Sequence, residues 1–300
     1  MDWYSASLSK LSENTMDYGY VIAGFIVGWL VGLTGVGGGS LMTPILLLFF
    51  NVKAAVAVGT DLLYASITKS VGIVAHGKLG NIDWRIVGWL AAGSLPAAAL
   101  TTVFLHQIGT ASETVVHGIK FWLGVALLLT SVSVLFRQEL MRLNKNEHLV
   151  PHKFVPAATV ILGLVLGFLV TLTSVGAGAL GVTALLILYP KISVNKIVGS
   201  DVAHAVPLTL VAGLGHASLG TVDYGLLGKL LIGSIPGIWI GSHMTTKFSE
   251  QWVRNLLALI LVYVGQKLAF PQLPQVLGLT VLLSIALLKH WLDKRLAGSK

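Results

Sequence analysis

Two glycine-rich segments, each with hydroxyl side chains, are the parts of this sequence best suited to binding a small ligand. They read TGVGGGS over residues 34–40 and TSVGAG over residues 173–178, and apolar stretches flank both. Each is expected to end one helix and to begin another, so that the new helix presents free N–H groups and the positive end of its dipole. Such a helix start binds anions, and glycine allows a ligand to approach the backbone closely. The candidate binding residues are Thr34, Gly37, Gly38, Gly39, Ser40, Thr173, Ser174, Gly176 and Gly178.

The same glycines have a structural alternative, because small residues also permit close packing of membrane helices. A nucleotide-binding loop is excluded, since GVGGGS follows no strand and lacks the lysine of a P-loop.

Two acidic residues, Asp61 and Asp201, lie inside otherwise apolar segments. A carboxylate in a membrane costs about 2.5–3.5 kcal/mol on insertion scales, so it requires a partner or a function. We expect these carboxyl groups to carry protons, with a helix cap or an inter-helix hydrogen bond as the structural alternative. The adjacent hydroxyl groups of Thr60 and Ser200 are further candidate ligands for a substrate.

Two basic side chains accompany these acids. Lys69 lies in the middle of the apolar segment 54–76 and could supply the positive charge that an anion needs. An ion pair with another helix, or a stem that reaches the membrane surface, is the alternative. His204 follows Asp201 by one helical turn, and because imidazole titrates near physiological pH it is a candidate proton relay.

The composition describes a membrane protein. Of the 300 residues, 55% are hydrophobic and 11% are charged, whereas soluble chains have roughly 25% charged residues. The net charge of +8 comes from basic residues in short loops and in the C-terminal tail, which is typical of cytoplasmic loops and not of a nucleic-acid interface. Cysteine is absent, which excludes disulfides and cysteine metal sites. The acidic N-terminus predicts no cleavable signal peptide.

The chain contains a long internal repeat. Gly24, Gly28 and Thr34 recur 139 positions later, and the motif Gly59-Thr60-Asp61 recurs 140 positions later as Gly199-Ser200-Asp201. The repeat predicts a first transmembrane repeat (18–136), a basic cytoplasmic linker (137–154), a second transmembrane repeat (155–270), and a final transmembrane helix with a basic cytoplasmic tail (271–300).

The distribution of lysine and arginine predicts that the two repeats face opposite ways. Loop 77–85 contains Lys78 and Arg85, whereas its counterpart 217–225 contains neither residue type. We therefore expect an all-α polytopic protein of two inverted-topology repeats, with the N-terminus outside and the C-terminus in the cytoplasm, as in many secondary transporters of the cell inner membrane. Segments 39–50 and 178–190 are short for a crossing, so re-entrant hairpins are preferred and complete crossings stay open.

Other polar residues at helix ends suggest structural roles. Asp83 and Asp223 precede apolar helices and are expected to be N-caps. His76 and His216 are expected near helix C-termini, where histidine is favoured electrostatically.

Catalytic motifs are absent from the sequence. It contains neither HExxH nor GxSxG, and its nine histidines are scattered. We expect no enzyme activity, no metal and no cofactor. An anion channel that uses the same glycine segments as a filter is the alternative to a transporter.

The motifs GLTGVGGGSLMTPIL, VAVGTDLLYASITKSVG and HGKLGNIDW, with their echoes in the second half, resemble the sulfite exporter TauE/SafE family of membrane proteins. The similarity extends over about residues 18–270. It implies a transporter of small sulfur-containing or organic anions such as sulfite, thiosulfate or sulfonates, coupled to protons. The second half departs from the first where Pro44 becomes Thr183 and Gly38 becomes Ala177, so the two glycine segments need not bind substrate equally.

Overall fold

The computed structural model describes residues 2–34, 39–110, 112–143, 151–244 and 250–274, all of them helical or in connections between helices. The helices are α1 (Asp2–Thr34), α2 (Gly39–Leu48), α3 (Ala54–Lys78), α4 (Trp84–Ile108), α5 (Glu113–Leu143), the short 3-10 helix η1 (His152–Phe154), α6 (Val155–Thr173), α7 (Ala179–Leu188), α8 (Val194–Ser218), α9 (Tyr224–His243) and α10 (Glu250–Ala269). The expected all-α fold is confirmed.

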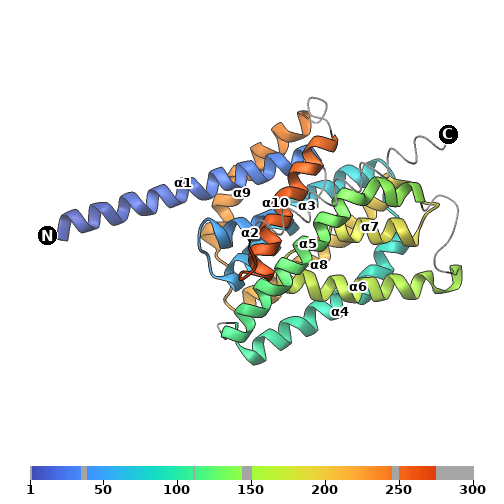
Figure 1. Cartoon of the computed structure of the whole chain (residues 1–300), viewed down its shortest axis with the longest axis horizontal. Coiled ribbons are helices and arrows are strands. Elements are labelled where there is room, and N and C mark those ends of the chain that lie inside the picture. Colours follow the sequence, from blue (N-terminus) through green and yellow to red (C-terminus); the bar gives the residue numbers. More distant parts are fainter. Residues whose placement is uncertain (1, 35–38, 111, 144–150, 245–249, 275–300) are drawn as a thin grey trace.

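The helices pack most closely in pairs that join the two halves of the chain. Figure 1 shows α1 alongside α9 and α4 alongside α6, and glycines bring both pairs into backbone contact. A Cβ atom at Gly28 would overlap the backbone of Ser234, and one at Gly167 would overlap the backbone of Ser94. These are equivalent positions of the repeat, so both halves use the same glycines for the same contact.

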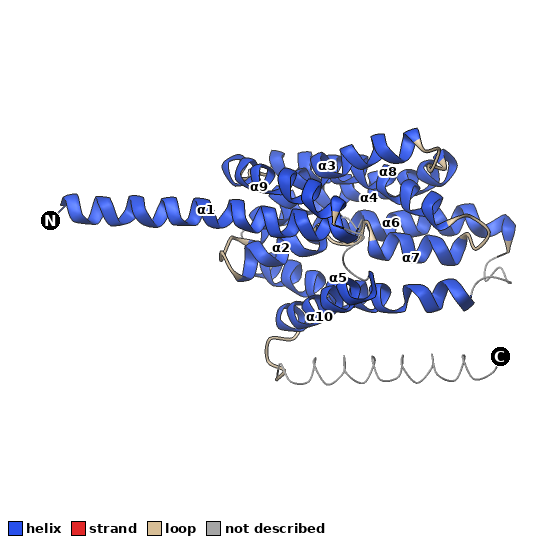
Figure 2. Ribbon diagram, turned by 90° about the horizontal axis from the view of Figure 1, so that it is seen from above, coloured by secondary structure: helices blue, strands red, loops and turns tan. Residues whose placement is uncertain are grey.

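Two further pairs complete the bundle. The equivalent helices α3 and α8 pack against each other, and so do α5 and α10. At the second contact, a Cβ atom at Gly265 would lie 2.9 Å from the carbonyl oxygen of Gly124. Seen from above in Figure 2, α5 and α10 lie along one side of the molecule, and the first turns of α1 extend beyond the rest.

The helix surfaces are those of a multi-pass membrane protein. By length and composition, five of the described helices could span a membrane: α4, residues Glu113–Phe136 of α5, α6, α8 and α9. Large apolar side chains such as Leu100 (69% exposed) and Trp239 (65% exposed) point outward. Such a surface suits lipid and not water.

The two short helices match the short apolar segments of the sequence, whereas α1 begins at Asp2, before the expected first repeat, and α5 continues to Leu143, into the expected linker 137–154. Helices α2 and α7 have ten residues each, or about 15 Å at the helical rise, which is half of the roughly 30 Å hydrocarbon core. The final expected helix, within 271–300, lies outside the described residues apart from 271–274, and residues 144–150 of the expected linker 137–154 lie outside them as well.

Candidate functional site

Asp61 is completely buried in α3 and contacts the short helix α2. Its Oδ2 atom accepts hydrogen bonds from the backbone N–H (3.2 Å) and the hydroxyl group (2.6 Å) of Thr43. The carboxyl group therefore lies beside the second turn of α2, near the end of that helix at which the backbone dipole is positive.

Asp201 occupies the equivalent place in the second half. It is 1% exposed in α8, and a Cβ atom at Gly181 would overlap its Oδ1 atom. Gly181 lies in the first turn of α7, so each aspartate lies against the beginning of the short helix of its own half.

Lys69 connects α3 to the second glycine segment. Its ammonium group donates a 3.1 Å hydrogen bond to the carbonyl oxygen of Ala177, and the residue is 9% exposed. The carboxyl groups of Asp201 and Asp61 are near enough to interact electrostatically with it. Three buried ionisable side chains thus gather where α3, α8 and the second glycine segment approach one another.

The second glycine segment forms a non-helical connection between α6 and α7. Ser174, with φ 59°, ends α6 in the left-handed conformation, while Gly176 (φ 133°) and Gly178 (φ 125°) adopt values that favour glycine. The N–H groups of Gly181 and Val182 donate to the carbonyl oxygens of Gly176 and Gly178. The hydroxyl of Thr173 bonds to the carbonyl of Leu169 and to the N–H of Val175, so it stabilises the end of α6.

The first glycine segment lies largely outside the described residues. This holds for Gly37 and Gly38, and for the side chains of Thr34 and Ser40, while Gly39 is the first residue of α2. The predicted binding role of this segment stays a prediction.

Two buried polar atoms, one of Asp61 and one of the neighbouring Ser174, have no hydrogen-bond partner among the described residues. They are Oδ1 of Asp61 and the hydroxyl oxygen of Ser174. Ser174 is close enough to the Asp61 carboxyl group to interact with it, although the pair does not reach hydrogen-bond geometry. Buried polar atoms without a hydrogen-bond partner are costly, so these two atoms have unused capacity to bind a polar group.

Tyr64 and His204 each lie one helical turn after an aspartate, Asp61 or Asp201, and each binds a serine from the opposite half. The Tyr64 hydroxyl lies 2.7 Å from the Ser234 hydroxyl, and His204 Nε2 lies 2.7 Å from the Ser94 hydroxyl. The other ring nitrogen of His204, Nδ1, is buried without a partner among the described residues. Among the described residues, the candidate proton relay His204 is therefore hydrogen-bonded through only one of its two ring nitrogens.

Thr60 and Ser200 bind the backbone at the start of a helix from the opposite half. The N–H of Asp223 donates to the Thr60 hydroxyl (3.0 Å), and the N–H of Asp83 donates to the Ser200 hydroxyl (2.8 Å). Both aspartates accept a backbone N–H with their side chains at the starts of α9 and α4, which confirms them as N-caps. The two hydroxyl groups are thus fixed at helix junctions beside Asp61 and Asp201.

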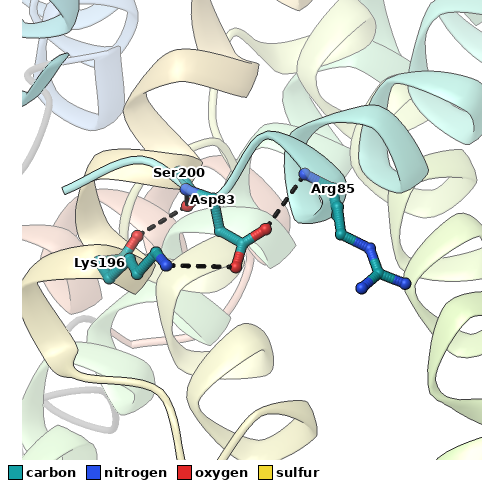
Figure 3. Close-up of polar contacts among 4 residues, drawn as sticks. All are labelled: Asp83, Arg85, Lys196 and Ser200. Carbon is teal, nitrogen blue, oxygen red and sulfur yellow. Dashed lines mark hydrogen bonds and ion pairs between the residues drawn. The ribbon is translucent and has the colours of Figure 1, made fainter. Parts of the chain in front are cut away.

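An ion pair distinguishes one of these junctions from the other. Lys196 Nζ lies 3.6 Å from Asp83 Oδ2, and Ser200 donates a 2.7 Å bond to the Lys196 carbonyl (Figure 3). The Arg85 side chain points away from the Asp83 carboxylate and only its backbone N–H binds it. The position equivalent to Lys196 in the first half is Val56, so the ion pair has no counterpart there.

His216 lies in the last turn of α8, as expected, and it also makes contacts beyond that helix end. Its buried ring bridges the Thr221 hydroxyl (2.9 Å) and the carbonyl oxygen of Thr171 (3.0 Å), which ties α8 to α6. The side chain of His76 lies outside the described part of the chain.

Several partners of the site residues were not anticipated from the sequence. Thr43, Ser94 and Ser234 are hydroxyl residues within apolar helices, and the recurring GSxP motif that contains Ser94 and Ser234 was the available signal for two of them. Within the described residues, no group of three or more metal-ligating side chains comes together.

Apolar helices around buried charged side chains form the architecture of a membrane transporter. The comparison with known proteins agrees with this class. The chain matches the family described as sulfite exporter TauE/SafE over residues 20–268, and it belongs to that family. Its relatives include a probable membrane transporter protein of Bacillus subtilis strain 168, YjnA, which is 42% identical over 255 residues, covering 84% of this chain and 100% of the relative.

Two more distant relatives are also described as probable membrane transporter proteins. They are YdhB of Bacillus subtilis strain 168, 26% identical over 83% of this chain and 99% of the relative, and MJ0441 of Methanocaldococcus jannaschii, 28% identical over 82% of this chain and 92% of the relative. No solved structure matches the chain.

Proposed function

We propose that the protein is a secondary transporter of small sulfur-containing or organic anions, of the sulfite, thiosulfate or sulfonate type. The observation that carries this proposal is the position of Lys69. Its ammonium group is buried, belongs to the first half, and binds a backbone carbonyl of the glycine segment of the second half. A buried cation of this kind is retained in a membrane helix for a substrate or a partner of negative charge.

The glycine segments are proposed to be breaks in discontinuous helices, related by inverted topology. The N–H groups that begin α2 and α7, together with Ser174, would donate to the anion. In this scheme Thr60 and Ser200 position the adjacent residues Asp61 and Asp201. The first glycine segment donates N–H groups to the anion as the second does.

We propose proton coupling because of where the two aspartates lie. Asp61 already accepts two hydrogen bonds in α2, and Asp201 lies against the first turn of α7. An ionised carboxylate at either place competes with an anionic substrate for the same helix end. Protonation removes that competition, so anion and protons are expected to bind together, with His204 as a relay.

The protein is proposed to lie in the cell inner membrane, with the N-terminus outside and the linker 137–154 in the cytoplasm. Alternating access would expose the site to one side at a time. A channel is the competing function, and it would share the same glycine segments.

Counterflow into proteoliposomes tests the proposal. Vesicles that contain purified protein and a high internal concentration of unlabelled anion are diluted into labelled anion, with thiosulfate, sulfite and small sulfonates compared. We expect transient accumulation of label for at least one of these anions, and its loss in Lys69→Met. Label that only equilibrates would indicate a channel, and no entry of any of these anions would contradict the proposal.

A further inference from the structure

Hydrogen bonds divide the central helices into two groups that do not coincide with the two halves of the sequence. We define bundle one as α1, α3 and α9, and bundle two as α4, α6 and α8. Each contains two helices from one half and one from the other, so the halves have exchanged α4 and α9.

Bundle one is joined by buried polar contacts. Ser234 of α9 donates a 2.8 Å bond to the carbonyl oxygen of Gly24 in α1 and also binds Tyr64 of α3. The N–H of Asp223 binds Thr60 of α3, and Lys229 of α9 pairs with Asp17 of α1.

Bundle two has the equivalents of two of these contacts and two contacts of its own. Ser94 of α4 binds His204 of α8, and the N–H of Asp83 binds Ser200. The added contacts are the ion pair of Lys196 with Asp83, and the bond of His216 to the Thr171 carbonyl of α6.

The seam between the bundles, where α3 meets α8, is of a different kind. A Cβ atom at Gly72 would lie 3.2 Å from Val202 Cγ1, and one at Gly213 would lie 2.6 Å from Leu63 Cδ2, so at these positions the two helices pack closely through apolar side chains. The hydrogen bond from Ser66 to the Val206 carbonyl is at the 3.5 Å limit. Apolar helix contacts can slide, whereas opening buried hydrogen bonds leaves polar groups unsatisfied.

The connections between the bundles also come in an equivalent pair. Loop 79–83 joins α3 to α4 and loop 219–223 joins α8 to α9. Each contains a glycine with positive φ, Gly80 (67°) and Gly220 (68°), and a Cβ atom at either would meet nothing within 4 Å. A glycine with open space around it, in a short loop, can absorb the backbone rotation that accompanies relative movement of packed bodies.

We infer that bundles one and two are the moving bodies and that the substrate passes along the seam between α3 and α8. This inference rests on the proposed transport function and specifies where in the molecule it occurs. Movement of the sequence halves against each other would instead separate the glycine-packed pairs α1–α9 and α4–α6. The charged side chain of Lys69, on α3, binds the carbonyl oxygen of Ala177 beside this seam, so its ammonium group is placed to exchange that carbonyl for a passing anion.

Disulfide trapping tests this inference, and the chain suits it because it has no native cysteine. The pair Gly72→Cys with Val202→Cys spans the seam. The matched control, Gly215→Cys with Thr102→Cys, lies within bundle two, where a Cβ atom at Gly215 would be 3.1 Å from Thr102 Cβ. Disulfides join Cβ atoms about 3.5–4.5 Å apart. The Cβ at Gly72 would lie 3.2 Å from Val202 Cγ1 and the one at Gly215 would lie 3.1 Å from Thr102 Cβ, so both pairs are close enough for a cross-link. If oxidation does not join a pair, a short bifunctional maleimide makes the same link.

Each variant is assayed in proteoliposomes while reduced and while cross-linked, so that the reduced form controls for folding. The seam cross-link is expected to lower transport at least tenfold, with recovery on reduction of its disulfide. The control cross-link is expected to leave transport within twofold of its reduced form. Transport by the cross-linked seam variant, or its loss in the cross-linked control, would overturn the inference. Failure of the proposed function would be distinct, because unmodified protein would then transport none of the anions.

Discussion

Ser174 has a conformation that is unfavourable for serine. Its φ of 59° lies in the left-handed region, which costs an L-residue roughly 1–2 kcal/mol, and its buried hydroxyl has no hydrogen-bond partner among the described residues. The equivalent position in the first half is Gly35, the residue type that accepts this conformation without strain. A strained residue with a buried hydroxyl near Asp61 agrees with the proposed role of Ser174 as a donor to the anion.

The substitution Ser174→Gly should therefore separate stability from function. It relieves the left-handed strain, so we expect the free energy of unfolding in detergent to rise by about 1 kcal/mol, while transport falls because the hydroxyl is lost. Ser174→Ala keeps the strain and should lose transport without the gain in stability. Thermal unfolding and anion counterflow on the same preparations measure both effects, and wild-type transport by Ser174→Gly would remove the hydroxyl from the mechanism.

Asp61→Asn tests the proposed competition between carboxylate and anion. In the wild type, transport should decrease as pH rises, since the deprotonated carboxylate keeps its place beside α2. Asparagine has a similar shape and cannot ionise, so the pH dependence of transport should flatten. Initial rates between pH 5 and pH 9, with Asp201→Asn in parallel, make the comparison. An unchanged pH profile in both variants would exclude the two aspartates as proton carriers.

At the same scale, the sequence indicated which residues carry charge into the membrane but not what they bind. Asp61, Lys69 and Asp201 were recognisable because an ionisable residue in an apolar helix requires a partner. The partners include the Ala177 carbonyl and the Thr43 hydroxyl, which ordinary backbone and threonine side chains supply without any pattern in the sequence. Ser94 and Ser234 could have been suggested by their recurring motif, but only the packing of α4 and α9 shows what they contact.

Within single helices, glycines have two distinct roles that can be separated in α4. A Cβ atom at Gly93 would overlap the backbone of Val160 in α6, whereas one at Gly88 would meet nothing within 4 Å. Close approach of α4 to α6 therefore depends on Gly93 and not on Gly88.

We expect Gly93→Ala to destabilise the protein by about 1–3 kcal/mol, as overpacking of a tight contact does. Gly88→Ala should leave stability unchanged or raise it by up to about 1 kcal/mol, because alanine favours the helix. Thermal unfolding of the two variants in the same detergent gives the comparison. Equal effects of the two substitutions would show that α4 and α6 are not held at backbone contact.

Several helix lengths were well predicted because they follow directly from apolar runs and from the polar residues that interrupt them, but α1 and α5 extend beyond their apolar runs, to Asp2 and to Leu143. The segments 155–173 and 178–190 correspond to α6 and α7, and the N-caps Asp83 and Asp223 begin α4 and α9 as expected. His216 shows the limit of this approach. Its place near a helix end was predictable, but its bridge to Thr171 depends on the neighbouring helix α6.

Across the whole molecule, the internal repeat predicted two equivalent sets of helices but not how the sets combine. Self-similarity in a sequence shows which helices are alike and says nothing about which pack together. The structure places α1 against α9 and α4 against α6, so each close pair takes one helix from each half (Figure 1). The shared glycine positions then explain why both halves retain the same small residues.

The proposed function depends on transport of the anion together with protons at the site around Lys69. Uphill accumulation tests it most directly, in proteoliposomes that are acidic outside and alkaline inside, with thiosulfate or a small sulfonate as labelled substrate. We predict that the internal concentration of label exceeds the external one, that a protonophore abolishes the excess, and that Lys69→Met shows none. Label that never exceeds its external concentration, or the same accumulation in Lys69→Met as in the wild type, would contradict the account.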